Sequence, residues 1–134
     1  MKYLLFFTFI ACASQPSQYS VVEKPEHFVS PGGSIDAAFY IQEDSFMGTL
    51  ALKPGAVVAK HSHDGSGEYL YFTKGQGELT IGDEVIKVKD NMAVFIPRGV
   101  EHSYVNTGKK EAFAIQVYSP RGPEKRFKKW KDEL

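Results

Sequence analysis

Three histidines and one glutamate are spaced so that their side chains could meet at one point. His61 and His63 are two residues apart in a β-forming run, and residues i and i+2 of a strand project from the same face. An Asp-Gly-Ser-Gly turn follows and can bring Glu68 beside them on an adjacent strand. A Pro-Arg-Gly turn precedes His102, which opens a further strand. Neutral imidazoles and a carboxylate are ligands for a divalent transition metal, so these four residues are predicted to form a metal site.

Strand parity gives candidates for the surroundings of this site. Counting by two from His102 places Tyr104 on the same inward face, where its phenol could act as a catalytic acid, donate a hydrogen bond or pack beside the ligands. Tyr104 is the one catalytic candidate. Gln116 shares a face with Tyr118 on the last strand, and the sequence leaves open whether that face meets the pocket or solvent.

The elements that would position these residues are short strands. Residues 34–119 consist of β-branched and aromatic runs separated by Gly, Pro, Asp and Asn, without helical periodicity of useful length. This pattern predicts an all-β sandwich or barrel of about nine strands. The expected strands are Ile35–Gln42, Phe46–Lys53, Val57–His63, Glu68–Thr73, Gly77–Ile81, Glu84–Val88, Met92–Ile96, His102–Asn106 and Ala112–Tyr118.

The same residues resemble the two sequence motifs of the cupin superfamily. The first, G-x5-H-x-H-x4-E-x6-G, matches at every position from Gly55 to Gly75. The second, G-x5-P-x-G-x2-H-x3-N, matches from Pro97 to Asn106, but Asn91 replaces its leading glycine. Asn best tolerates the left-handed backbone that a glycine would supply. The resemblance implies an all-β fold, the double-stranded β-helix (jelly roll, or cupin barrel), with the metal inside one open end.

The resemblance also sets expectations for function. Three imidazoles and one carboxylate leave about two positions open on a six-coordinate ion, for water, substrate or dioxygen. Fe, Mn, Ni, Zn, Co and Cu all suit the ligands, and iron or manganese is slightly favoured. We expect a metal-dependent enzyme of dioxygenase, isomerase or lyase type acting on a small molecule. The alternative is a non-catalytic module that binds a metal, a sugar or a carboxylate. Cupins often pair their barrels, so a homodimer is expected.

Composition limits the other function classes. Sixteen basic residues balance sixteen acidic ones among 134, so no overall field favours nucleic acid as a partner. The one cysteine, Cys12, excludes a disulfide framework and a thiolate cluster within the chain. Ten Phe, seven Tyr and one Trp supply the side chains of a real hydrophobic core.

The two ends give conflicting indications of localisation. Residues 1–13 are expected to be a signal peptide, and Phe9-Ile10-Ala11-Cys12 resembles a bacterial lipobox with Phe9 in place of Leu. Export is therefore expected, as a lipoprotein whose membrane contact is the lipid on Cys12, or into the periplasm after cleavage behind Ala13. The alternative is the endoplasmic reticulum lumen, since residues 131–134 read Lys-Asp-Glu-Leu. Residues 14–33 are expected to be a tether and N-terminal arm, 34–119 the barrel, and 120–134 a charged tail in which Phe127 and Trp130 could dock one helical turn.

Overall fold

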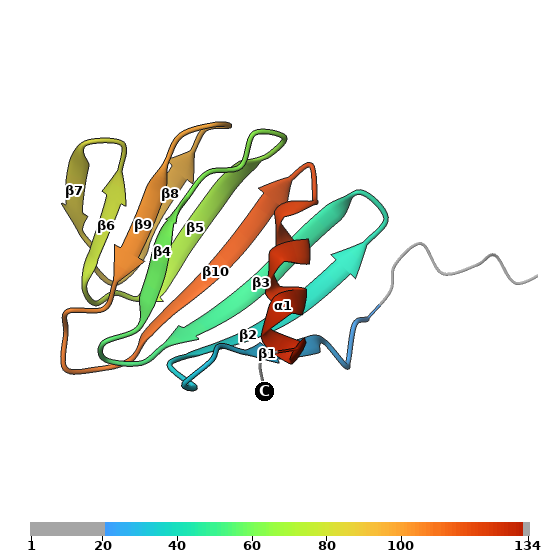
Figure 1. The fold of residues 1–134 in the computed structure, drawn as a ribbon, viewed down its shortest axis with the longest axis horizontal. Coiled ribbons are helices and arrows are strands. Elements are labelled where there is room, and N and C mark those ends of the chain that lie inside the picture. The colour runs from blue at the N-terminus through green and yellow to red at the C-terminus, as the bar shows by residue number, and fades with distance from the viewer. Residues whose placement is uncertain (1–20, 133–134) are drawn as a thin grey trace, which may run out of the picture.

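Ten strands and a short helical segment make up the part of the chain that the structure describes. A computed structural model describes residues 21–132 (Figure 1). The expected signal peptide, and the last two residues of the Lys-Asp-Glu-Leu end, lie outside the described residues. The strands are β1 (Glu26–Val29), β2 (Ile35–Gln42), β3 (Ser45–Leu52), β4 (Val57–His61), β5 (Gly67–Lys74), β6 (Glu78–Ile81), β7 (Glu84–Lys87), β8 (Met92–Ile96), β9 (His102–Val105) and β10 (Ala112–Ser119).

The strands form two antiparallel sheets that face each other. One sheet has six strands in the order β1-β2-β3-β10-β5-β8, and the other has four in the order β4-β9-β6-β7. Consecutive strands therefore pass repeatedly from one sheet to the other, as in a jelly roll. The predicted all-β double-stranded β-helix is confirmed.

Backbone geometry at the turns explains several of the sequence signals. Asn91, which stands where the cupin motif has glycine, adopts a left-handed backbone with φ of 57°. Gly82 has φ of 56° in the tight connection between β6 and β7. At Gly75 a side chain would collide with the backbone of Lys89, so only glycine allows the two segments to lie so close.

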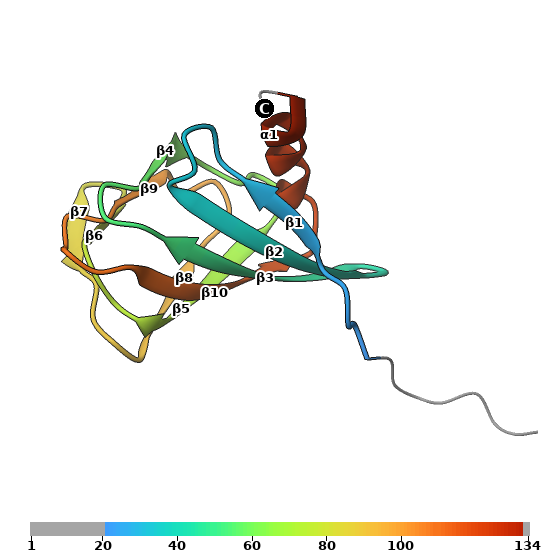
Figure 2. The ribbon, with the colours of Figure 1, turned by 90° about the horizontal axis from the view of Figure 1, so that it is seen from below.

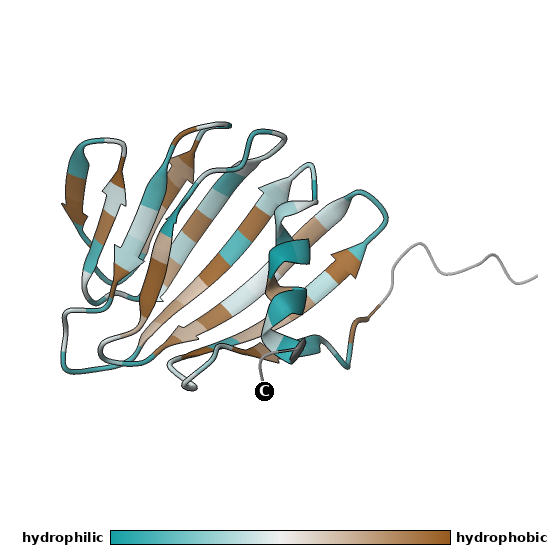
Figure 3. Cartoon of the chain, viewed as in Figure 1, coloured by the Kyte–Doolittle hydropathy of each residue, from teal (hydrophilic) through white to brown (hydrophobic). Residues whose placement is uncertain are grey.

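The core lies between the sheets and follows the alternation of inward and outward residues along each strand (Figure 3). On β5, Leu70 and Phe72 are buried, whereas Tyr69 and Tyr71 are 54% and 40% exposed. Strand parity counted from Glu68 predicts both of these faces.

The structure differs from the sequence-based expectation at two places, and at a third it contains the helical turn that was expected to dock. The expected tether and arm contain β1, which pairs with β2. β4 ends at His61, so His63 lies in the loop beyond the strand. The expected charged tail folds into a 3₁₀ helix, η1 (Pro123–Lys128), and α1 (Lys129–Asp132), beside β1 (Figure 2). Neither helix of the described chain is long and apolar enough to cross a membrane.

Candidate metal centre

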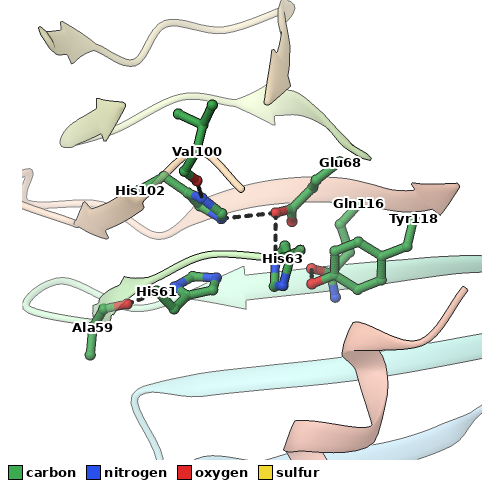
Figure 4. A network of polar contacts seen from close by, with 8 residues as sticks. All are labelled: Ala59, His61, His63, Glu68, Val100, His102, Gln116 and Tyr118. Atoms are coloured by element: carbon green, nitrogen blue, oxygen red, sulfur yellow. Dashed lines mark hydrogen bonds and ion pairs between the residues drawn. The ribbon is translucent and has the colours of Figure 1, made fainter. Parts of the chain in front are cut away.

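The four predicted ligands come together from both sheets. His61 ends β4 and is the register partner of His102, the first residue of β9. Glu68 enters from β5 of the other sheet, and His63 reaches the same point from the loop after β4. One ligand atom from each residue lies within 4.8 Å of the others (Figure 4). This group could hold a metal ion.

Backbone carbonyls orient two of the imidazole rings. The Nδ1 atom of His61 lies 2.7 Å from the carbonyl oxygen of Ala59, and Nδ1 of His102 lies 2.9 Å from that of Val100. A carbonyl only accepts hydrogen bonds, so each Nδ1 carries the proton in these contacts. The Nε2 atoms are then left with a free lone pair directed into the cluster. This arrangement is typical of metal-binding histidines.

The surroundings of Glu68 are the most informative feature of the cluster. Its Oε2 atom lies 3.0 Å from Nε2 of His102 and 3.3 Å from Nε2 of His63. His102 therefore faces an acceptor at both ring nitrogens, and a neutral imidazole has only one N–H to give. The Nε2 atoms of His61 and His63 are buried without a hydrogen-bond partner among the described residues. A cation between these atoms would satisfy all of them at once.

Electrostatics keep Glu68 and His61 in the form that binds a metal. Burial alone would raise the pKa of Glu68, but the adjacent imidazoles of His102 and His63 outweigh it and lower the pKa to about 2. Burial, followed by the positive charge of Arg126, lowers the pKa of His61 to about 4. At neutral pH Glu68 is therefore a carboxylate and His61 is neutral.

Two residues of β10 form one wall beside the cluster. Tyr118 is the register partner of Glu68, and its ring centroid lies 5.1 Å from that of His63. Its hydroxyl donates to Oε1 of Gln116 over 3.2 Å, and both side chains are 1% exposed. The open question about this face of β10 is thus resolved toward the interior. Gly48 on β3 makes room, because a Cβ there would lie 2.9 Å from Nε2 of Gln116.

Tyr104 points inward, as strand parity predicts. It is 4% exposed, its ring stacks on Phe72, and its hydroxyl donates a hydrogen bond of 2.5 Å to the carbonyl of Gln76. Burial raises its pKa to about 12. The phenol therefore stays protonated at neutral pH and is a donor, not a base.

A cavity of about 390 Å³ connects the cluster with the rest of the interior. Most of its wall is apolar and comes from the inner faces of both sheets. Arg126, Phe127 and Trp130 of the C-terminal segment complete the lining. Sequence reasoning expected this segment to dock but did not connect it with the site, because the direction of Arg126 depends on how η1 packs.

Comparison with known proteins agrees with this geometry. A family model described as a cupin domain matches residues 48–118. The tetracenomycin polyketide synthase protein TcmJ of Streptomyces glaucescens is 32% identical over 78 residues, 58% of this chain and 52% of that protein. The mannose-1-phosphate guanylyltransferase of Klebsiella pneumoniae is 25% identical over 104 residues, 77% of this chain and 22% of that protein.

Solved structures show the same fold. An RmlC-like cupin from Shewanella frigidimarina superposes with a TM-score of 0.66 at 18% identity, covering 84% of this chain and 98% of that chain. This likeness concerns the fold alone. The chain spans about half or less of the length of the first curated relatives that it matches.

Proposed function

Because this chain belongs to the cupin family, we propose that it holds one divalent transition metal on His61, His63, Glu68 and His102 and acts as a metal-dependent enzyme on a small molecule. The observation that carries the proposal is the pair of acceptors at the ring nitrogens of His102. Without a metal, a buried neutral His102 would leave one of these contacts repulsive. Binding of a metal at Nε2 would remove the conflict.

The donor set limits the range of metals that fit the site. Three imidazoles and a carboxylate suit Fe, Mn, Ni, Zn, Co and Cu, and iron or manganese is slightly favoured. Bound there, such an ion would polarise an oxygen atom of the small molecule as a Lewis acid. This chemistry fits an enzyme of dioxygenase, isomerase or lyase type.

The chain's own residues would bind and orient the small molecule. The cavity of about 390 Å³ is at the lower end of ligand-pocket sizes, and its walls are mostly apolar. Two of the relatives carry names that refer to polyketide synthesis and to a sugar phosphate, and both fields of chemistry use small oxygenated molecules. Tyr104 is our candidate for the catalytic acid, and it would have to exchange its contact with Gln76 for one with the substrate.

A second candidate function is supported by the scarcity of other acids and bases. Among the described residues, the ionisable side chains along the cavity are Lys60 and Arg126, apart from Tyr104 and the ligands His61, Glu68 and His102. Lys60 is bound to Glu101 at 2.8 Å on the surface. The small number of potential catalytic acids and bases favours a non-catalytic module that binds a metal, a sugar or a carboxylate. The two functions differ in turnover, which only the enzyme would show with a candidate substrate.

Metal content tests the site itself. We expect about one transition metal per chain after loading with iron, manganese, nickel or zinc, and none in the His61→Ala, His102→Ala double variant. The matched control is His27→Ala, because His27 is 63% exposed and faces Asp36 far from both motifs. An empty wild-type protein after all four loadings would overturn the proposal. Equal metal content in the double variant would show that the metal binds elsewhere.

A further inference from the structure

We propose that the C-terminal segment completes the binding site and that Arg126 anchors the carboxylate of a small organic acid bound in the metal cavity. This inference rests on the proposed metal site and names the class of ligand that the site takes. Arg126 lies outside the segment matched by the cupin family model, which ends at residue 118. It is therefore a feature of this chain and not of the family motifs.

Arg126 is a cation in the cavity lining, and no described side chain is its acidic partner. It lines the same cavity as His61, Glu68 and His102. Among the side chains of residues 21–131, no ion pair or hydrogen bond of its guanidinium is found. Its contact is with the face of the neighbouring Phe127 ring, 4.8 Å from the centroid. Its charge acts on the cluster, since it contributes to the lowered pKa of His61.

The segment that carries Arg126 is fixed to the barrel on both sides of it. Phe127 is 3% exposed and meets the Phe39 ring edge-on at a centroid distance of 4.8 Å. Glu124 is also 3% exposed and accepts hydrogen bonds from Nε of Arg121, at 3.1 Å, and from the backbone of Gly122, at 2.5 Å. Arg126 is thus presented from an ordered backbone, which reduces the entropy lost when a ligand binds.

The charge balance of the cavity favours an anion. A divalent ion on the four ligands would leave one positive charge after Glu68 is counted, and Arg126 adds another. The charge of Lys60 is compensated by Glu101, so it does not offer a second free cation. A guanidinium binds a carboxylate through two parallel hydrogen bonds. One guanidinium with few further donors suits a carboxylate better than a phosphate dianion.

Few other polar groups line the cavity, and one of them, Nε2 of Gln116, is a buried donor without a hydrogen-bond partner among the described residues. Ser30 accepts from the backbone N–H of Ile35 at 2.9 Å, and its hydroxyl lies 3.4 Å from that of Ser34. The rest of the cavity wall is mostly apolar. The ligand that fits is therefore small, with an apolar body, one carboxylate for Arg126 and an oxygen atom directed at the metal.

The test is calorimetric titration of the metal-loaded full chain with pyruvate, malonate, succinate, inorganic phosphate and malonamide. We expect at least one carboxylate to bind, and Arg126→Gln to weaken its binding about tenfold or more. Arg126→Lys should restore part of the affinity, since it keeps the charge but loses the paired geometry. Lys125→Gln is the matched control, because it removes a positive charge from an exposed position of the same segment, and it should change the affinity less than twofold.

Several results would overturn the inference. These are no binding by any carboxylate, equal binding of malonamide, tighter binding of phosphate than of every carboxylate, or unchanged affinity in Arg126→Gln. Metal content measured on the same samples separates this inference from the proposed function. If the wild-type protein holds its metal and the Arg126→Gln variant binds carboxylates as tightly as the wild type, only the role of Arg126 is refuted. Circular dichroism identifies a variant that fails to fold. If Arg126→Gln does not fold, the carboxylate affinities of Arg126→Lys and Lys125→Gln are compared instead, and only Arg126→Lys should bind more weakly than the wild type.

Discussion

Replacing Glu68 by glutamine separates a metal ligand from a structural ion pair. In the metal-free wild type, Oε2 of Glu68 and Nε2 of His102 are 3.0 Å apart, and Nδ1 of the same ring faces the Val100 carbonyl. The amide of a glutamine could donate to Nε2 and leave the Nδ1 proton for Val100. We therefore expect metal-free Glu68→Gln at pH 8 to be about as stable as the metal-free wild type, because the hydrogen bond gained at Nε2 offsets the loss of the favourable interactions that lower the pKa of Glu68.

The stabilisation by bound metal should be much smaller in Glu68→Gln than in the wild type. A metal at a hundredfold excess over its dissociation constant stabilises the wild type by about 2.7 kcal/mol. For a domain of this size that corresponds to a rise in Tm of about 10 °C. Glu68→Gln loses the anionic ligand, so its Tm should rise by only about 1–2 °C under the same conditions.

Scanning calorimetry with a chelator and with excess manganese or zinc measures both effects. The matched control is Glu101→Gln, since Glu101 is 60% exposed and adjoins His102 in sequence. This variant should retain the full metal response. If metal-free Glu68→Gln instead loses about 3–5 kcal/mol, Glu68 is a partner of protonated histidines in a buried ion pair, and the reasoning is refuted.

Three further predictions concern packing, pH and assembly. Gly48→Ala should cost about 1–3 kcal/mol in urea unfolding, because its Cβ would lie 2.8 and 2.9 Å from two side chains, whereas Gly65→Ala has open space and should change stability little. The pKa of His61 is lowered to about 4, so the unfolded chain takes up its proton first. Metal-free stability should thus fall between pH 6.5 and 4, and less so in His61→Asn; equal slopes would contradict this. Tyr69 and Phe95, 54% and 50% exposed, pack together on the outer sheet face. We propose this face as the homodimer contact, and Tyr69→Lys should yield monomers in light scattering, whereas a monomeric wild type would exclude the dimer.

The barrel could be predicted from sequence because its determinants are local. Turn residues and alternating side chains mark each strand, and the left-handed backbone of Asn91 was expected from its place in the motif. β1 was missed because it is only four residues long and buries a single side chain, Phe28. Such a strand exists through its pairing with β2, and a pairing partner is not visible in a four-residue pattern.

The metal ligands were found by spacing, although one step of that reasoning was wrong. Parity was expected to carry His61 and His63 on one strand, but β4 ends at His61. His63 nevertheless reaches the cluster, because a hydrogen bond holds the loop after β4 in place. The backbone carbonyl of His63 accepts this bond from the backbone N–H of Gly99 at 3.0 Å. The motif fixes which residues meet, while the route of the backbone is settled by contacts between distant segments.

β10 shows why the residues around the ligands are harder to predict. Its inward face carries Gln116 and Tyr118, while its outward face carries Phe113, Ile115 and Val117. Hydropathy alone would turn the strand the other way, because the outward set is more apolar. The observed orientation places an amide and a phenol beside the candidate metal centre, where polar groups have a use that a plain hydrophobic core does not offer. A reversal of this kind is expected at functional sites, where local preference yields to chemistry.

The same argument applies to Arg126, on a part of the chain where no motif gives guidance. A basic tail usually remains in solvent, since each exposed charge is well hydrated there. Here Phe127 and Trp130 pack on the barrel, with ring centroids 4.7 Å apart, and this docking directs the preceding arginine toward the cavity. The apolar pair thus supplies the free energy that holds a cation beside the candidate metal centre. The ligands come from motifs shared with the family, whereas the group proposed to select the substrate depends on how one short segment packs.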